Sequence, residues 1–333
     1  MIAIDAHTHI LTEDAMRMLS AEHPDIPVGV TPIDGDAARL TVGEISFQPF
    51  AIGGFDIERR LKDMRSSRVD MHVLAPTPQT FFYEKDAGFA ETAAMIQNDE
   101  IARLSMQNRS HFRGIATLPM QDPQRAAAEL RRATKLGLAG AMIGSNTNGK
   151  NLDDPDLEPL WHAANELRSL IFIHPVNVLA APRLRPYYMT NLIGNPTETT
   201  VAAASLLFSG VTERYPEIRF ALSHGGGFLP YQAGRFAHGS QVRPEARRKF
   251  ATGDAAIKCF LYDSICHSLP ALDFLVGHAG ASRVLLGSDY PFDMAWNCAD
   301  IVRGLAISSQ ERDAILGQNA QAIIDGAGQP PRI

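Results

Sequence analysis

The sequence contains little cysteine, no run of basic residues and no long apolar stretch, and each absence excludes a class of protein. Its cysteines, Cys259, Cys266 and Cys298, are odd in number and lack Cys-x-x-Cys spacing, which is typical of reduced thiols and not of a disulfide framework or a thiolate zinc site. A net charge of −6 without clustered Lys and Arg argues against a nucleic-acid partner. Since neither a signal peptide nor a stretch long enough to cross a bilayer is seen, we expect a cytoplasmic protein that binds a small molecule and no membrane.

A dinucleotide-binding motif is also missing, and this bears on the fold. No Gly-x-Gly-x-x-Gly follows an early strand, so an open doubly wound sheet is disfavoured. Short β-rich runs instead alternate with amphipathic helical segments, which is the pattern of a parallel sheet. The predicted strands are residues 2–9, 69–75, 112–118, 138–143, 170–174, 218–224, 260–263 and 283–289. The predicted helices include residues 90–106, 122–136, 156–167, 198–215 and 271–279.

Eight such strands predict an α/β fold in which the sheet closes into a (β/α)₈ barrel. With 333 residues, 45% of them hydrophobic, the chain is long enough for one barrel domain spanning residues 1–333. Residues 12–54 interrupt the pattern after the first strand, because they are poorly periodic and rich in Pro, Gly and Asp. We expect this insertion to form a cap near the active-site mouth.

The first strand carries two histidines on one face. In the run that ends at His7-Thr8-His9, a period of two places His7 and His9 on the same side of a strand, so their imidazoles converge. Further candidates, His174, His224 and Asp289, each follow a predicted strand. Because the carboxyl ends of parallel barrel strands meet at one face, we expect these side chains to lie together.

Three imidazoles and a carboxylate are ligands that a borderline divalent cation prefers. We predict a metal held by His7, His9, His174 and Asp289, most simply Zn²⁺, with Mn²⁺, Co²⁺ and Fe²⁺ as alternatives. His224 is either a further ligand or, as we favour, the acid/base next to the metal. Three glycines follow it in the sequence and leave its ring unobstructed.

Asp263 ends the seventh predicted strand. It is expected either to hold one of the imidazoles in a single tautomer or to cap the following turn, and the sequence leaves both roles open.

Several motifs together resemble the amidohydrolase superfamily, and more narrowly its branch of aminocarboxymuconate-semialdehyde decarboxylase and related decarboxylases of aromatic or dienoic acids. The resemblance covers residues 2 to about 325. It implies a distorted (β/α)₈ (TIM) barrel, a divalent metal at the four residues named above, and His224 as the catalytic histidine, with Asp289 serving both the metal and the chemistry. The motifs are His7-Thr8-His9, residues 114–120, Ile173-His174-Pro175, residues 223–227 and residues 287–292.

The same resemblance implies a homodimer in which Arg235 is contributed across the interface to a substrate carboxylate. In the semialdehyde decarboxylase that the chain resembles, the N-terminal insertion holds a second arginine for that carboxylate. In this sequence Gln48 occupies the corresponding position. A neutral amide cannot form the charged fork of an arginine, so a different substrate is expected. Arg183 or Arg185 are possible replacements, and Tyr187 is a further candidate for substrate binding.

The predicted reaction is metal-dependent, non-oxidative decarboxylation of an aromatic or muconate-type acid. No lysine motif for pyridoxal phosphate and no thiamine motif is evident, so the substrate must itself accept the electrons that the departing carboxylate leaves behind. A hydrolase acting on a lactone, an amide or a C–C bond, or a hydratase, needs the same residues and stays an alternative. A barrel that binds metal without catalysis is the remaining one.

Aromatic and imidazole side chains near the expected barrel mouth have two interpretations. His267 and Trp296 follow the last two predicted strands, where they can line the pocket or simply pack. The consecutive residues Phe81, Phe82 and Tyr83 form either an aromatic wall for a flat substrate or part of the core beneath the insertion.

Overall fold

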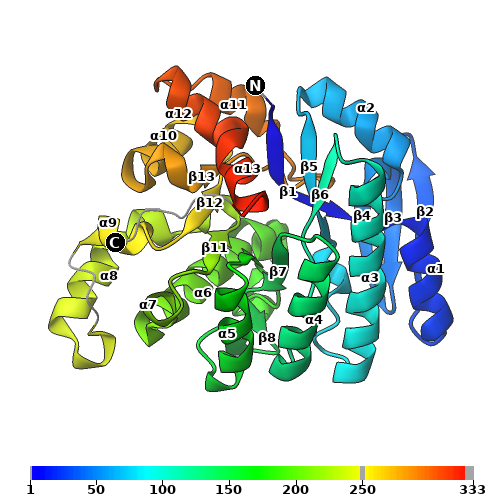
Figure 1. Cartoon of the computed structure of the whole chain (residues 1–333), viewed down its shortest axis with the longest axis horizontal. Helices are drawn as coiled ribbons and strands as arrows, with labels where there is room; N and C mark the ends of the chain where they lie inside the picture. The colour runs from blue at the N-terminus through cyan, green and yellow to red at the C-terminus, as the bar shows by residue number, and fades with distance from the viewer. Residues whose placement is uncertain (1, 248–251, 327–333) are drawn as a thin grey trace.

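Eight parallel strands lie at the centre of the computed structural model, which describes residues 2–247 and 252–326 (Figure 1). They form a three-stranded sheet, in the order β1-β5-β6, and a five-stranded sheet, in the order β13-β12-β11-β10-β7. The strands are β1 (Ile4–Ile10), β5 (Met71–Pro76), β6 (Phe112–Gly114), β7 (Gly140–Gly144), β10 (Leu170–His174), β11 (Arg219–Leu222), β12 (Leu261–Asp263) and β13 (Val284–Leu285).

Two parallel backbone bridges join these sheets into a ring. Ala116, just past β6, bridges Ala141 of β7, and Thr8 of β1 bridges Tyr290, just past β13. Hydrogen bonds support the second seam, because the amide of Asp289 donates to the carbonyl of His7 at 2.9 Å. The predicted α/β barrel is confirmed, and its distortion lies at these seams, where β6 and β13 are shorter than the sequence predicted.

Helices surround the ring, as Figure 1 shows. The predicted helix at residues 198–215 is in fact two helices, because Gly210 takes a left-handed conformation with φ of 79° that breaks the hydrogen-bond ladder. The helices are α2 (Ile57–Ser67), α3 (Ala87–Gln107), α4 (Pro123–Lys135), α5 (Glu158–Glu166), α6 (Asn195–Ser209), α7 (Val211–Arg214), α8 (Leu229–Val242), α9 (Gly253–Ile257), α10 (Leu269–Ala279), α11 (Cys298–Arg303), α12 (Ser309–Asp313) and α13 (Asn319–Ile324).

The main core fills the space between the ring and these helices. Every residue of β10 is buried, as expected for a parallel strand covered on both faces. Polar side chains within the ring, including His7 and Asp263, are fully buried as well. Burial of polar groups is costly unless they have partners, so these buried polar side chains mark a candidate functional site.

The insertion after β1 has regular structure of its own. It contains α1 (Glu13–Glu22) and an antiparallel sheet of β2 (Val28–Asp34), β3 (Ala37–Val42) and β4 (Ile45–Ala51), at the right edge of Figure 1. A short hairpin of β8 (Asn146–Thr147) and β9 (Lys150–Asn151) follows β7. The insertion packs on α3 over a second, smaller apolar cluster that includes Leu40, Phe50 and Phe82.

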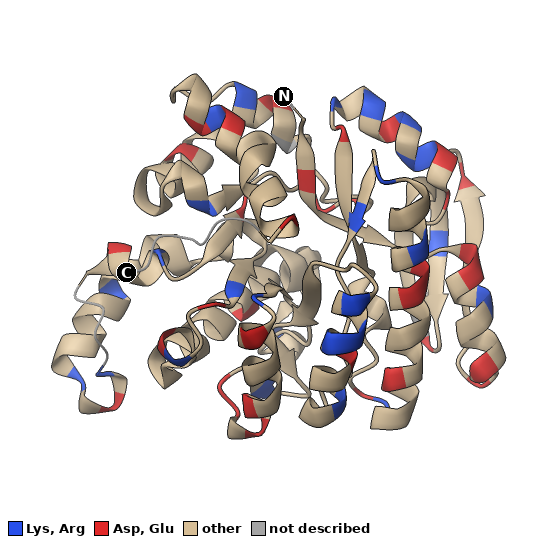
Figure 2. Ribbon diagram, in the orientation of Figure 1, with Lys and Arg blue, Asp and Glu red and all other residues tan. Residues whose placement is uncertain are grey.

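Charges of both signs are interspersed along the outer helices, for example on α2 and α3 in Figure 2. This distribution agrees with the absence of a basic run in the sequence. Within residues 2–247 and 252–326, no helix is both long and apolar enough to cross a membrane.

Candidate metal centre and active-site pocket

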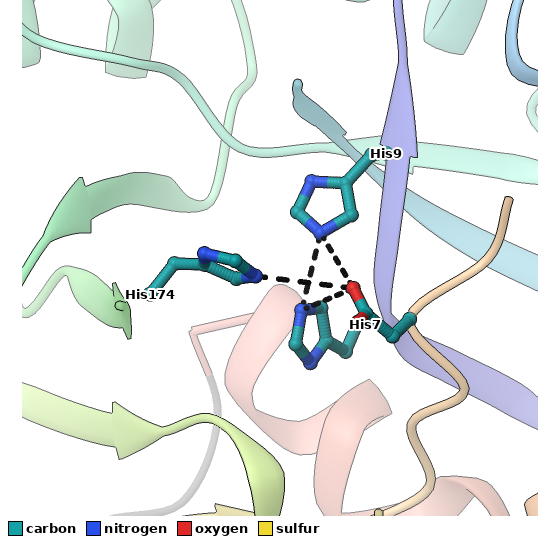
Figure 3. A group of neighbouring side chains, drawn as sticks. His7, His9 and His174 are labelled. Atoms are coloured by element: carbon teal, nitrogen blue, oxygen red, sulfur yellow. Dashed lines mark hydrogen bonds and ion pairs between the residues drawn. The ribbon is translucent and has the colours of Figure 1, made fainter. Parts of the chain in front are cut away.

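Four buried side chains converge at the carboxyl ends of the strands. His7 and His9 come from β1, His174 ends β10, and Asp289 follows β13, and their ligand atoms all lie within 4.8 Å of one another. Asp289 Oδ1 is 3.1 Å from His9 Nε2, 3.4 Å from His7 Nε2 and 3.8 Å from His174 Nε2. Figure 3 shows the three imidazoles pointing toward one another around a carboxylate oxygen. The structure thus brings together the four residues expected to bind a metal.

The other ring nitrogen of each histidine faces a hydrogen-bond acceptor. His7 Nδ1 is 2.7 Å from Asp263 Oδ2, His9 Nδ1 is 3.1 Å from the carbonyl of Pro76, and His174 Nδ1 is 3.2 Å from the carbonyl of Pro175. Protons on the three Nδ1 atoms satisfy these acceptors and leave three Nε2 lone pairs at the centre.

Those lone pairs are arranged as a cation requires. His7 Nε2 and His9 Nε2 are only 3.2 Å apart, and two lone pairs at that distance repel unless a proton or a metal ion lies between or near them. His174 Nε2 is buried and has no hydrogen-bond partner among the described residues. A divalent cation fits this donor set.

The pKa shifts of His174, His9 and Asp289 agree with that fit. Burial lowers the pKa of His174 to about 3 and also lowers the pKa of His9, so both rings are neutral at pH 7. Burial alone raises the pKa of Asp289, but the surrounding histidines, His7 foremost, hold it well below its usual range. The pKa of His7 is raised, since Asp289 and Asp263 outweigh the effect of burial.

His224 lies beside this group on the turn after β11. Its Nε2 is 3.3 Å from Asp289 Oδ2, and its amide donates to Asp263 Oδ2 at 2.8 Å. The turn is left-handed at His224, with φ of 54°, and continues through three glycines of positive φ. A Cβ atom at Gly227 would lie 2.2 Å from the carbonyl oxygen of Pro196, so only glycine fits there.

Asp263 performs both of the functions that the sequence left open. Its Oδ2 accepts from His7 Nδ1 and from the amide of His224, while Oδ1 accepts from the amides of Gly225 and Ile265 at 2.8 and 3.0 Å. Burial on its own raises the pKa of this carboxyl, but the hydrogen bond from His7 and the other donors lower it below the ordinary value. Asp263 therefore orients His7 and fixes the turn that carries His224.

A cavity of about 560 Å³ opens next to His224 and Asp289. This volume suits a small aromatic or dienoic acid. Its walls are largely apolar. The few polar side chains that line it would therefore orient a bound substrate. The apolar part includes Phe228, Tyr231, Ile265, Phe274, Leu275 and Met294, and the polar side chains include Asn191, Asn195, His224, His267 and Asp289.

The aromatic candidates divide between this pocket and the core. His267 lines the pocket and stacks on Trp296 with ring centroids 5.2 Å apart, while Trp296 lines a neighbouring cavity of about 180 Å³. Phe81, Phe82 and Tyr83 are buried and belong to the two cores, and none of them lines either cavity. For these three residues the packing interpretation is therefore the one the structure favours.

The substrate-binding candidates lie outside the pocket of their own chain. Gln48 is exposed on β4 and accepts from Arg39 Nε at 2.9 Å. Tyr187 is 87% exposed in the segment after β10, and Arg235 is exposed on α8. None of these side chains lines the cavity beside His224. Their roles in substrate binding stay predictions, and Arg39 is a charged neighbour of Gln48 that the sequence did not single out.

Arg183 and Arg185 are also exposed. Cys259 and Cys266 are free thiols, as expected, and the side chain of Cys298 lies outside the described part of the chain.

Comparison with known families and structures identifies the family to which the chain belongs. The family model described as Amidohydrolase matches residues 4–325. The chain belongs to the amidohydrolase family. This amidohydrolase is 34% identical, over 328 residues, to the 2-amino-3-carboxymuconate-6-semialdehyde decarboxylase of Dictyostelium discoideum, covering 96% of this chain and 90% of that protein.

Solved structures of similar proteins extend the comparison to three dimensions. The 5-carboxyvanillate decarboxylase of Sphingomonas paucimobilis shares 25% identity and a TM-score of 0.83, covering 97% of this amidohydrolase and 99% of that chain. The dihydroxybenzoic acid decarboxylase of Polaromonas sp. JS666, solved with manganese and the inhibitor 2-nitroresorcinol, shares 26% identity and a TM-score of 0.79, covering 100% and 99%. The donor set and these relatives together support a divalent metal as cofactor of the amidohydrolase.

Proposed function

We propose that this member of the amidohydrolase family is a carboxy-lyase that removes CO₂, without oxidation, from an aromatic or muconate-type carboxylic acid. The observation that carries the proposal is the convergence of three Nε2 atoms and Asp289 directly beside His224, at the wall of a largely apolar cavity. Similarity over nearly the whole chain to decarboxylases of such acids supports this reaction over other amidohydrolase chemistry.

In this proposal His7, His9, His174 and Asp289 hold the metal. A bound divalent ion supplies positive charge that stabilises negative charge developing on a substrate oxygen. We propose Zn²⁺ first, because imidazole and carboxylate are its usual ligands. Manganese is the alternative, since the related dihydroxybenzoic acid decarboxylase was solved with it.

His224 is the proposed proton donor. Its imidazole lines the cavity next to Asp289, where it can deliver a proton to the carbon that bears the carboxylate. The new C–H bond takes an electron pair from the conjugated system of the substrate. The bond to the carboxyl carbon then breaks, its electron pair returns to that system, and CO₂ leaves. The net change replaces a carboxylate by a proton and needs no oxidant or reductant.

We further propose a homodimer in which Arg235 binds the substrate carboxylate of the neighbouring site. Arg235 lies one turn of α8 beyond Tyr231, which lines the cavity and is 80% exposed. Phe228 and Phe274, which also line it, are 42% and 40% exposed. A second chain that covers this apolar rim brings a cation to a cavity that holds few polar groups of its own.

Two proposals about the chain as a whole accompany this function. Residues 1–333 form one domain in which residues 12–54 act as a cap, and Phe47 of the insertion contacts Phe292, which in turn contacts His9, with ring centroids 5.3 and 5.0 Å apart. The protein is cytoplasmic, because free Cys259 and Cys266 suit a reducing compartment.

The experiment that tests this function is an assay of CO₂ release from a panel of aromatic and muconate-type acids. Metal-loaded protein should release one CO₂ for each substrate consumed, and the metal-free protein is the control. Consumption of a substrate with uptake of water and no CO₂ would replace the decarboxylase by the hydrolase or hydratase alternative.

A further inference from the structure

Arg60 is a fully buried arginine on α2, behind the metal centre, that the proposed chemistry does not use. Burial lowers its pKa, but only to about 10, so the guanidinium is charged at neutral pH. A buried charge is costly unless its donors are satisfied, so the partners of this side chain show what it stabilises.

Those partners carry the metal ligands. Arg60 Nη2 donates to the carbonyl of His9, and Nη1 lies 3.4 Å from Thr8 Oγ1, so two donors hold the end of β1. Nε donates at 3.0 Å to the carbonyl of Gly53, at the end of the insertion. His72 Nδ1 of β5 lies 3.3 Å from Nη1.

The guanidinium also lies over a ring in a second ligand-bearing segment. Its central carbon lies 4.8 Å from the centre of the Tyr290 ring, the residue directly after Asp289. The Tyr290 hydroxyl donates to Asp63 at 2.8 Å, and Asp63 in turn accepts from Arg59 Nε at 2.8 Å. The ring is therefore held by Arg60 over the ring and by Asp63 at its hydroxyl.

We propose that Arg60 is a positioning residue that fixes the spacing between His9 and Asp289 and so tunes the metal affinity. The inference rests on the proposed metal centre. The guanidinium of Arg60 contacts the backbone of His9 and the ring of Tyr290, which directly follows Asp289. His9 and Asp289 lie 280 positions apart in the chain and meet at the seam of the barrel.

Arginine is specifically required for this arrangement. A guanidinium donates in several fixed directions within its plane while its face stacks on a ring, whereas the ammonium of lysine is a point charge. Arg60→Lys keeps the charge and loses the fork and the stacking. A purely structural role would lower the stability of metal-free and metal-loaded protein alike, whereas a positioning role changes the metal site itself.

The test measures the dissociation constant for Mn²⁺, by competition with a chelator, and the visible absorption of the Co²⁺-loaded protein. In Arg60→Lys the dissociation constant should rise on the order of 10–100-fold and the cobalt spectrum should change. The control is Arg219→Lys, since Arg219 is also buried but begins β11 at the opposite end of the barrel. It should leave both readouts unchanged.

An unchanged affinity and cobalt spectrum in folded Arg60→Lys would overturn the inference. If wild-type protein binds no metal, the proposed function fails instead. If Arg60→Lys does not fold, Tyr290→Phe, which keeps the ring under Arg60, is compared with Tyr290→Leu, which removes it. We expect weaker metal binding in the leucine variant only, and equal binding in the two variants would also overturn the inference.

Discussion

Replacement of Asp263 by asparagine removes one negative charge and changes the hydrogen-bonding of a single atom. In the wild type each carboxylate oxygen accepts two hydrogen bonds, one oxygen from His7 and the amide of His224, the other from the amides of Gly225 and Ile265. In Asp263→Asn one of these oxygens becomes an NH₂ group, which donates and cannot accept.

The new NH₂ group must face two hydrogen-bond donors on whichever side it is placed. Only one of the four donors around residue 263 can become an acceptor instead. Backbone amides always donate, whereas His7 can move its proton from Nδ1 to Nε2 and accept at Nδ1. We therefore expect the NH₂ group on the side of His7, with the amide of His224 left unpaired. A proton on His7 Nε2 blocks the atom that faces the metal.

The magnitude follows from the bond lost. The His224 amide loses one hydrogen bond to a charged acceptor, which contributes about 1.5–3 kcal/mol, so the free energy of unfolding of metal-free Asp263→Asn should fall by about 1.5–3 kcal/mol. Metal affinity should fall about 10–100-fold, the usual effect of losing a partner of a ligating histidine.

Chemical denaturation and a chelator-competition titration measure the two quantities. Asp254→Asn is the matched control, because Asp254 pairs at 3.2 Å with His278 on the exposed surface. It should change neither quantity appreciably. Wild-type metal affinity in folded Asp263→Asn would show that the tautomer of His7 does not depend on Asp263.

Three other predictions concern catalysis, assembly and thiol reactivity. His224→Ala should keep its metal and lose activity by about 10²–10⁴-fold, as measured by metal analysis and turnover; loss of metal would make His224 a ligand. Arg235→Ala should weaken substrate binding with the metal retained, and mixing it with His224→Ala should restore activity in heterodimers; no recovery despite confirmed subunit exchange would exclude action across an interface. Burial raises the pKa of Cys266 to about 12 and that of Cys259 to about 11, so both thiols stay protonated at pH 8. Their alkylation, followed by peptide mass spectrometry, should accelerate only as the pH rises toward those values. Rapid labelling at pH 8 would refute this effect of burial.

The metal-site residues were accessible to sequence reasoning because each follows its own strand. A period of two along β1 fixes the faces of His7 and His9, and the parallel barrel brings His174, His224 and Asp289 to the same end. Strand ends were less certain, since β6 and β13 continue beyond their ladders only as single bridges. The break at Gly210 depends on backbone conformation that helical periodicity does not reveal.

Other features depend on contacts between distant segments. In the insertion, β2 carries mostly exposed residues, so alternation gave no clear signal there, whereas buried and less buried positions do alternate along β3. Phe81 to Tyr83 looked equally suited to a pocket or a core, and only their packing within the two apolar cores distinguishes these interpretations. Arg60 is buried one turn before buried Met64 on α2, and a charge on a core-facing position was the available signal.

In the proposed reaction a proton replaces a carboxylate without oxidation. A substrate found in the panel should be converted in D₂O by metal-loaded protein, with CO₂ quantified and the product examined by NMR and mass spectrometry. We predict one CO₂ per product molecule and one deuterium at the carbon that carried the carboxylate. A product that retains the carboxyl carbon and has gained the elements of water would show that the enzyme is a hydrolase or hydratase and not a decarboxylase.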